Sequence, residues 1–245
     1  MTFTMTGRLS QCILLAYRTP VSSVSRLVPR GLELVTRGDW AFWNIVACRI
    51  DGMRPAGAPR LLGVSYHHVA YRLYVRAAIA GGQIIEGLYF VRSDADHCLM
   101  AKAGNLLTDF CFHPAKIALT ANESRLTLSV QNSPGGAGNA RLSVELNGEP
   151  IAYPDSCFDS PDEAGRFLKY RPFGLSRDAK GTWLKVAEVL RDESEWNEMP
   201  LRVTDAEWSF FESLNQRDVR LEHATCVAPI AYRWRLGRKE KPAKV

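Results

Sequence analysis

Two strand-like segments joined by a glycine pair constrain the fold of this chain more than any other feature. Residues 66–80 and 84–92 read as strands, and Gly81-Gly82 lies between them. A glycine pair supplies the positive φ angles that a tight hairpin turn requires. We therefore predict a β-hairpin over residues 66–92.

The remainder of the chain repeats this strand-and-turn pattern. We count about eleven strand segments against three or four short helices, and the alternation of strand and long helix typical of βαβ units is missing. Residues 40–50 are apolar on both faces of a strand, which indicates a central position covered on both sides. The sequence therefore predicts a mainly β (α+β) fold, an antiparallel β-barrel or cone with a few short flanking helices.

Besides a short helix expected between Pro20 and Pro29, helix signals occur in three places. Residues 160–163 (Ser-Pro-Asp-Glu) and 204–207 (Thr-Asp-Ala-Glu) have the spacing of capping boxes, and each predicts a helix start. Apolar residues at helical spacing over 99–110 predict a third helix, which lies on the barrel and closes one end. Its expected core-facing stripe consists of Leu99, Ala103, Leu106, Leu107 and Phe110.

The composition is that of an ordinary globular protein, with 245 residues, 46% hydrophobic and 23% charged. We expect one domain over residues 1–245, with a basic C-terminal tail over 236–245 that contributes to the net charge of +5. No nucleic-acid-binding motif accompanies this mild charge. No apolar segment approaches the roughly 20 residues that span a bilayer, and no signal peptide is recognisable. We therefore expect a cytoplasmic protein without a membrane or nucleic-acid partner.

Residues that commonly bind metals are present but scattered. The six cysteines include no CxxC pair, and most have apolar neighbours, which is typical of reduced, buried thiols. Asp94, Asp96 and His97 are close in sequence, but a metal site needs three or four converging ligands. We interpret them as a polar turn that precedes a helix, and we predict neither a metal nor a cofactor.

The first strand of the hairpin carries a polar stripe. Side chains alternate across a strand, so His68, Arg72 and Tyr74 share one face. This face lies either in solvent or inside a barrel cavity. In a cavity, Arg72 would bind a carboxylate with its paired donors, and His68 and Tyr74 would add hydrogen bonds. Glu86 on the second strand, or an acidic ligand, would supply the negative charge that a buried Arg72 requires.

Three segments of the chain resemble the YqjF-like family of uncharacterised bacterial proteins. They are residues 72–76 (Arg-Leu-Tyr-Val-Arg), 87–96 (Gly-Leu-Tyr-Phe-Val-Arg-Ser-Asp-Ala-Asp) and 110–116. That family is grouped with acetoacetate decarboxylase-like proteins. The resemblance implies a mainly antiparallel β-barrel or cone with a central cavity.

The resemblance also shows where this chain departs from the decarboxylase. In that enzyme a lysine activated by an adjacent lysine forms a Schiff base with a β-keto acid. Its Gly-x-Pro-Lys-Lys motif corresponds here to residues 109–113, Asp-Phe-Cys-Phe-His, so both lysines are absent. Lys116 stands alone nearby. The resemblance therefore implies that Arg72 and the barrel are retained and that the decarboxylase activity is not.

Three hypotheses follow. The leading one is an uncharacterised acetoacetate decarboxylase-like protein that binds a small organic (keto) acid through Arg72, His68, Tyr74 and Glu86. The alternative is a lyase or hydrolase acting on a keto acid through Lys116 or His113. The third is a non-catalytic interaction or structural protein whose cavity is filled by its own aromatic side chains. The sequence leaves a homo-oligomer open.

Overall fold

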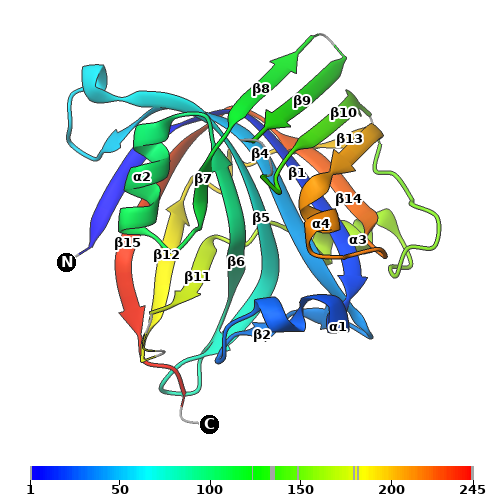
Figure 1. The fold of residues 1–245 in the computed structure, drawn as a ribbon, viewed down its shortest axis with the longest axis horizontal. Coiled ribbons are helices and arrows are strands. Elements are labelled where there is room, and N and C mark those ends of the chain that lie inside the picture. Colours follow the sequence, from blue (N-terminus) through cyan, green and yellow to red (C-terminus); the bar gives the residue numbers. More distant parts are fainter. Residues whose placement is uncertain are drawn as a thin grey trace.

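The computed structural model of this protein describes residues 2–122, 124–132, 136–147, 149–178, 180 and 182–243. Its main elements are long, twisted strands that form one large curled sheet (Figure 1). The predicted hairpin is confirmed: the fifth and sixth strands pair antiparallel, from His68 opposite Ala95 to Ala78 opposite Ile84. The four longest strands of the first hundred residues are β1 (Phe3–Pro20), β4 (Trp40–Pro55), β5 (Val64–Ala78) and β6 (Ile84–Ala95).

The sheet curls because β1 pairs along both of its edges. One edge pairs with β4, and the other pairs with β15 and then with β14. The strands β1, β4, β5, β6, β11, β12 and β15 therefore follow one another, and the last returns to the first. β6 pairs parallel with β7 and β11, so the sheet is mixed although mainly antiparallel. The later strands here are β7 (Phe112–Pro114), β11 (Phe173–Arg177), β12 (Leu184–Leu190) and β15 (Ile230–Glu240).

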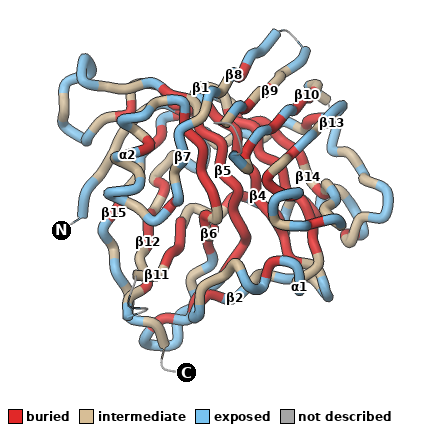
Figure 2. The backbone as a smooth tube through the Cα atoms, in the orientation of Figure 1, coloured by how far each residue is buried: buried red, intermediate tan, exposed pale blue. Residues whose placement is uncertain are grey.

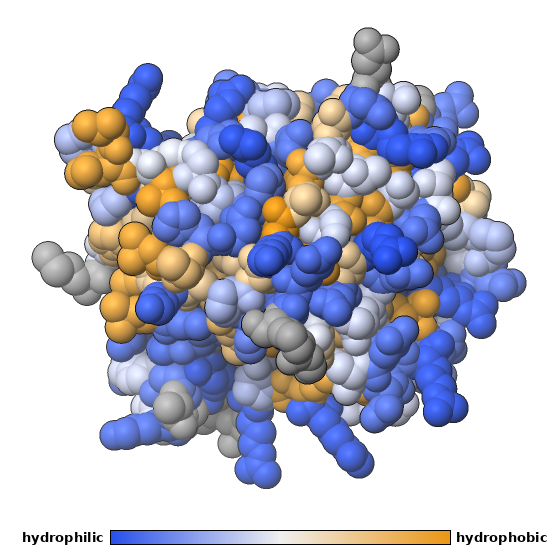
Figure 3. Space-filling model, turned by 45° about the horizontal axis from the view of Figure 1, so that its top comes forward, coloured by the Kyte–Doolittle hydropathy of each residue, from blue (hydrophilic) through white to orange (hydrophobic). Residues whose placement is uncertain are grey.

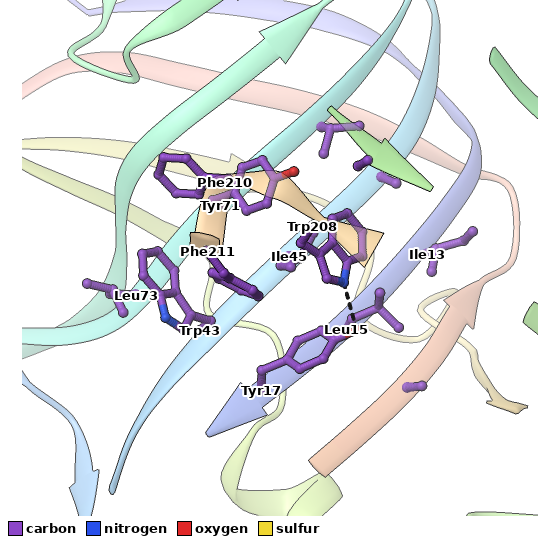
Figure 4. Packing of buried hydrophobic residues seen from close by; sticks show 14 of the residues in the cluster. Ile13, Leu15, Tyr17, Trp43, Ile45, Tyr71, Leu73, Trp208, Phe210 and Phe211 are labelled. Carbon is purple, nitrogen blue, oxygen red and sulfur yellow. Dashed lines mark hydrogen bonds between the residues drawn. The ribbon is translucent and has the colours of Figure 1, made fainter. Parts of the chain in front are cut away.

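A second layer covers the outer face of β1, β4 and β5. An aromatic cluster fills the space between the layers (Figure 4), where the Tyr71 ring centroid lies 4.6 Å from that of Phe210. The indole Nε1 of Trp208 donates a hydrogen bond of 2.9 Å to the Tyr17 hydroxyl. The layer consists of β8 (Lys116–Ala121), β9 (Arg125–Gln131), β10 (Ala140–Leu146), β13 (Glu198–Trp208) and α4 (Ser209–Ser213), and β14 (Arg220–Val227) joins β13 to the edge of β1.

The central strands are buried on both faces, as the sequence predicts for residues 40–50 (Figure 2). One face belongs to the aromatic cluster between the layers, and the other faces the inside of the curled sheet. The short elements lie around this frame. They are α1 (Val21–Val24), η1 (Ser25–Leu27), β2 (Glu33–Leu34), β3 (Thr36–Arg37), η2 (Arg60–Leu62), α2 (Cys98–Leu107) and α3 (Pro161–Phe167).

The helix signals had mixed outcomes. The capping box at Ser160 is confirmed, because its hydroxyl accepts a hydrogen bond of 3.2 Å from the backbone N–H of Glu163. The box at 204–207 is wrong as a helix start, since these residues belong to β13 and pair with β10. Strand pairing outweighs the local capping signal there, and the helix begins at Ser209.

The C-terminal segment and α2 also differ from expectation. Residues 236–240, expected to begin a basic tail, form the end of β15 and pair with β12. Residues 244–245 of that segment lie outside the described residues. The leucines of α2 do not form a core stripe, because Leu99, Leu106 and Leu107 are 58%, 85% and 48% exposed. Among the described helices, none is long and apolar enough to cross a membrane.

Candidate functional site

The polar stripe of β5 lies inside the curled sheet. Arg72, His68 and Tyr74 are 2%, 6% and 1% exposed, so the solvent alternative for this face is wrong. The residues between them on the strand point outward into the aromatic cluster, because side chains alternate across a strand. The fold thus buries a cation beside a histidine and a tyrosine.

Arg72 has polar contacts but no acidic partner. Its Nη2 donates to the amide oxygen of Asn44, while the Nε is buried without a hydrogen-bond partner. Its guanidinium carbon lies 5.4 Å from the Phe90 ring centroid and 5.7 Å from that of Tyr170. In the described part of the chain no carboxylate forms an ion pair with it. A buried cation of this kind is costly, and an anionic ligand would offset that cost.

Asn44 links Arg72 to the end of α3. Besides accepting from Arg72, its amide donates a hydrogen bond of 2.8 Å to the Tyr74 hydroxyl. The hydroxyl in turn donates to the backbone carbonyl of Leu168, the residue that ends α3. Burial raises the pKa of Tyr74 to about 12, so the phenol stays protonated. The Asn44 amide N–H and the Tyr74 hydroxyl therefore both donate in the direction away from Arg72. The Asn44 oxygen stays directed at Arg72 and fixes its guanidinium in place.

His68 lies four residues before Arg72 on the same face of β5, and both side chains line one cavity. Burial, and then the nearby Arg72 guanidinium, lower its pKa to about 3, so the imidazole is neutral near pH 7. Its Nε2 is buried without a hydrogen-bond partner. The ring stacks on Phe112 with centroids 5.1 Å apart. Asn105 of α2 holds Phe112 in place by accepting from its backbone N–H (2.7 Å) and donating to its carbonyl (2.8 Å).

A small cavity of about 20 Å³ lies against Arg72 and His68. A space of this size holds about one water-sized group. Two unpaired polar atoms, Arg72 Nε and His68 Nε2, belong to residues that line it. Its lining includes no lysine. The other main lining side chains are Cys12, Cys48, Phe90, Tyr170, Trp196 and Tyr232.

The two thiols that line this cavity are unreactive at neutral pH. Cys12 and Cys48 lie opposite each other on β1 and β4, and both are buried. Burial raises the pKa of both thiols, that of Cys48 to about 12, so neither is a thiolate at neutral pH. Among the described residues, no group of three or more His, Cys, Asp or Glu side chains is placed to hold a metal ion.

Glu86 does not belong to this site. The strand register places it opposite Arg76, four residues from Arg72 along β5 and thus about 13 Å away. Its side chain is exposed, and its Oε2 accepts from Arg171 Nε at 3.0 Å. The expectation that Glu86 surrounds the ligand with Arg72 is therefore not met.

The two reactive groups of the catalytic alternative also lie elsewhere. His113 is exposed on β7, and partial burial followed by the nearby Arg92 lowers its pKa. Lys116 is exposed at the start of β8, in the outer layer opposite Gln131. Neither residue lines the cavity at Arg72. The structure therefore does not bring them together with the ligand-binding candidates.

A β-bulge interrupts the simple alternation of side chains in the β5–β6 hairpin. The β5–β6 register shifts between Tyr71 and Arg72, so Arg72 faces Phe90 while Tyr71 faces Arg92. Arg92 is thereby turned to the outer aromatic cluster, where it binds the fully buried Asp94 at 2.7 Å. Burial raises the pKa of Asp94. The bulge thus separates this ion pair from the cavity.

The sequence contained one signal for the site residues that the sequence analysis did not predict. Asn44 interrupts an otherwise apolar strand and now appears as the partner of Arg72. Tyr170, Trp196 and Tyr232 come from distant segments, and no local pattern brings them together. Only the closed order of the strands does so.

The fold is that of acetoacetate decarboxylase-like proteins. The structure aligns with acetoacetate decarboxylase from Legionella pneumophila at a TM-score of 0.60 and 14% identity, covering 98% of this chain and 87% of the other. An acetoacetate decarboxylase-like enzyme from Sphingomonas wittichii RW1 aligns at 0.58 and 12% identity, covering 100% and 94%. The enduracididine biosynthesis enzyme MppR, complexed with pyruvate, aligns at 0.55 and 11% identity, covering 98% and 89%. At these identities the likeness shows the fold alone.

The chain belongs to the DUF2071 family of uncharacterised conserved proteins, which matches residues 6–229. No curated protein matches the sequence. The expected acetoacetate decarboxylase-like fold is therefore confirmed.

Proposed function

We propose that this protein binds a small organic acid inside the curled sheet, with Arg72 as the carboxylate anchor. The observation that carries the proposal is a guanidinium that is 2% exposed, lacks an ion-pair partner among the described residues, and lies against a cavity. Arginine presents paired donors that match the two oxygens of a carboxylate. A carboxylate there would neutralise the buried charge and satisfy the free Nε.

His68 supports the same proposal. Its neutral imidazole can either donate or accept at the unpaired Nε2, depending on the tautomer. This group suits the carbonyl or hydroxyl oxygen next to the carboxylate of a keto or hydroxy acid. A similar fold in MppR was solved with pyruvate, a keto acid.

The proposal is binding without a Schiff base. The lining of the cavity includes no lysine, and the segment over 109–113 carries Phe112 and His113 instead of a lysine pair. Phe112 stacks on His68, so it supports the site by packing. No observation favours the catalytic alternative through Lys116 or His113.

Calorimetric titration with pyruvate, acetate and acetoacetate tests the proposal. Arg72→Gln keeps a polar side chain but removes the charge, and we expect a loss of roughly 10- to 150-fold in affinity, the equivalent of one charge-assisted interaction. Arg76→Gln is the matched control, because Arg76 lies on the same strand but is exposed and paired with Glu33. Equal affinities for the wild-type protein and Arg72→Gln would remove Arg72 as the anchor.

A further inference from the structure

An apolar pocket lies beside the Arg72 cavity. Its volume is about 100 Å³, several times the space at Arg72 itself. Three methionines from three different elements, β1, β4 and α2, contribute to it. None of its lining residues carries a formal charge at neutral pH. Its main lining residues are Met5, Met53, Met100, Leu107, Phe112 and Leu236.

The apolar pocket and the Arg72 cavity share a wall one side chain thick. His68 and Trp234 line both spaces. Phe90 of the cavity also stacks on Phe110 of the pocket, with ring centroids 3.8 Å apart. His68 therefore stands between a buried cation on one side and an apolar space on the other. The wall therefore contains a buried polar atom, His68 Nε2, that has no hydrogen-bond partner.

Size decides how a ligand would be divided between the two spaces. The cavity at Arg72 has room for one water-sized group, which suits a carboxylate head but not the rest of an acid. The remainder of the ligand must continue into a neighbouring space. The apolar pocket has the room and lies on the other side of His68 and Trp234, so an acid that occupies both spaces must displace one of these side chains.

The side chains that line the pocket determine which ligand tails can bind there. Methionine side chains are flexible and polarizable, so they adapt to hydrocarbon and aromatic groups of different shape. A charged tail would lose its hydration there without gaining a partner. α2 and the β4–β5 connection lie on the same side of the molecule (Figure 1), and apolar patches are visible on the surface there (Figure 3). Both segments carry exposed leucines, namely Leu61, Leu62 and Leu106. A hydrophobic compound would therefore meet an apolar surface before it meets the pocket.

We propose that the ligand is an amphipathic monocarboxylic acid, whose carboxylate binds Arg72 and whose hydrocarbon or aryl tail occupies the methionine-lined pocket. This inference rests on the proposed function and names the class of acid. It predicts that affinity grows with the length of the tail. Each added methylene that enters the pocket strengthens binding about fourfold, the equivalent of about 0.8 kcal/mol.

Calorimetric titration of the full chain with acetate, butyrate, hexanoate and octanoate tests the inference, with octanol as the probe that lacks a carboxylate. We expect a stepwise gain along the series until the pocket is full, and weak binding of octanol. Met100→Asp places a charge in the pocket and should weaken octanoate at least tenfold, and the loss should be smaller for acetate, which has no tail. Leu106→Asp is the matched control, because Leu106 lies on the same helix, is 85% exposed and does not line the pocket.

The possible outcomes distinguish a failure of this inference from a failure of the proposed function. Equal affinity along the series, lost in Arg72→Gln, overturns the amphipathic ligand and leaves the carboxylate anchor standing. Octanoate and octanol binding equally, with no effect of Arg72→Gln, overturns the anchor and the inference with it. An equal loss of octanoate affinity in Met100→Asp and Leu106→Asp also overturns the proposed role of the pocket.

Discussion

Replacing Arg72 by methionine should stabilise the ligand-free protein while it abolishes acid binding. Methionine has a similar length and no charge, so the change removes a cation that is 2% exposed and lacks an acidic partner among the described residues. An unpaired buried ion costs several kcal/mol in desolvation. If the role of Arg72 were structural, the same substitution would instead lower the free energy of unfolding.

The losses on substitution offset part of this desolvation cost. The amide oxygen of Asn44 would lose its donor, which costs about 1–3 kcal/mol for a buried group. The contacts of the guanidinium with the rings of Phe90 and Tyr170 contribute about 0.5–2 kcal/mol. We expect a net gain of about 1–2 kcal/mol in the free energy of unfolding. In a chain of this size each kcal/mol raises the Tm by roughly 2–4 °C.

Urea denaturation in a buffer free of carboxylates measures this gain, and a second series with excess acid measures the loss of ligand stabilisation. Ligand at a hundred times its Kd should stabilise the wild-type protein by about 2.7 kcal/mol and leave Arg72→Met unaffected. Arg76→Met is the control, and as an exposed change it should stay within about 0.5 kcal/mol. If Arg72→Met instead lowers the free energy of unfolding by more than about 2 kcal/mol while the control is neutral, the guanidinium holds the fold together and our reasoning fails.

Three further predictions concern the surroundings of the site. Gly104→Ala should destabilise by about 1–3 kcal/mol although alanine favours helices, because its Cβ would lie 2.5 Å from the Phe112 ring. In a Phe112→Ala background the cost should vanish in urea denaturation, and simple additivity would contradict the clash. Glu222→Gln should cost about 3–5 kcal/mol, because it leaves the buried Arg18 without the carboxylate that now lies 2.6 Å away, and an unchanged Tm would count against this. Because the pKa of His68 falls from 6.5 to about 3 on folding, only the unfolded chain takes up its proton between these values, so stability should decrease as the pH falls from 6.5 to 3. His68→Phe should lose up to about 1.4 kcal/mol of this dependence per pH unit, and an identical pH profile would exclude His68 as its source.

The hairpin over residues 66–92 and the burial of the strand at 40–50 could be predicted because both depend on neighbours in sequence. Alternation placed Arg72, His68 and Tyr74 on one face, and the structure agrees. Alternation could not decide whether that face looks inward. The answer depends on β1 pairing with both β4 and β15, which are contacts across the whole chain.

The wrong expectations have specific causes. Glu86 shares a face with Phe90 by simple counting, but the register places it opposite Arg76 and outside the site. The leucines of α2 follow a helical period, yet Ala101 is the buried residue of this helix, and Leu99 and Leu106 are exposed. The residues at 204–207 look like a helix start but pair with β10. In each case a tertiary partner decided the outcome, and one strand or helix alone does not specify that partner.

The pairing of β1 with β15 also affects how the protein is made. Phe3 lies opposite Leu236, so β1 leaves the ribosome long before β15, and this edge of β1 stays uncovered until β15 has been made. Contacts between such distant residues form slowly, because a long loop must close first. During this time β1 offers an open edge to other chains. Synthesis rate and chaperone supply should therefore govern the yield of soluble protein more than the stability of the finished fold does.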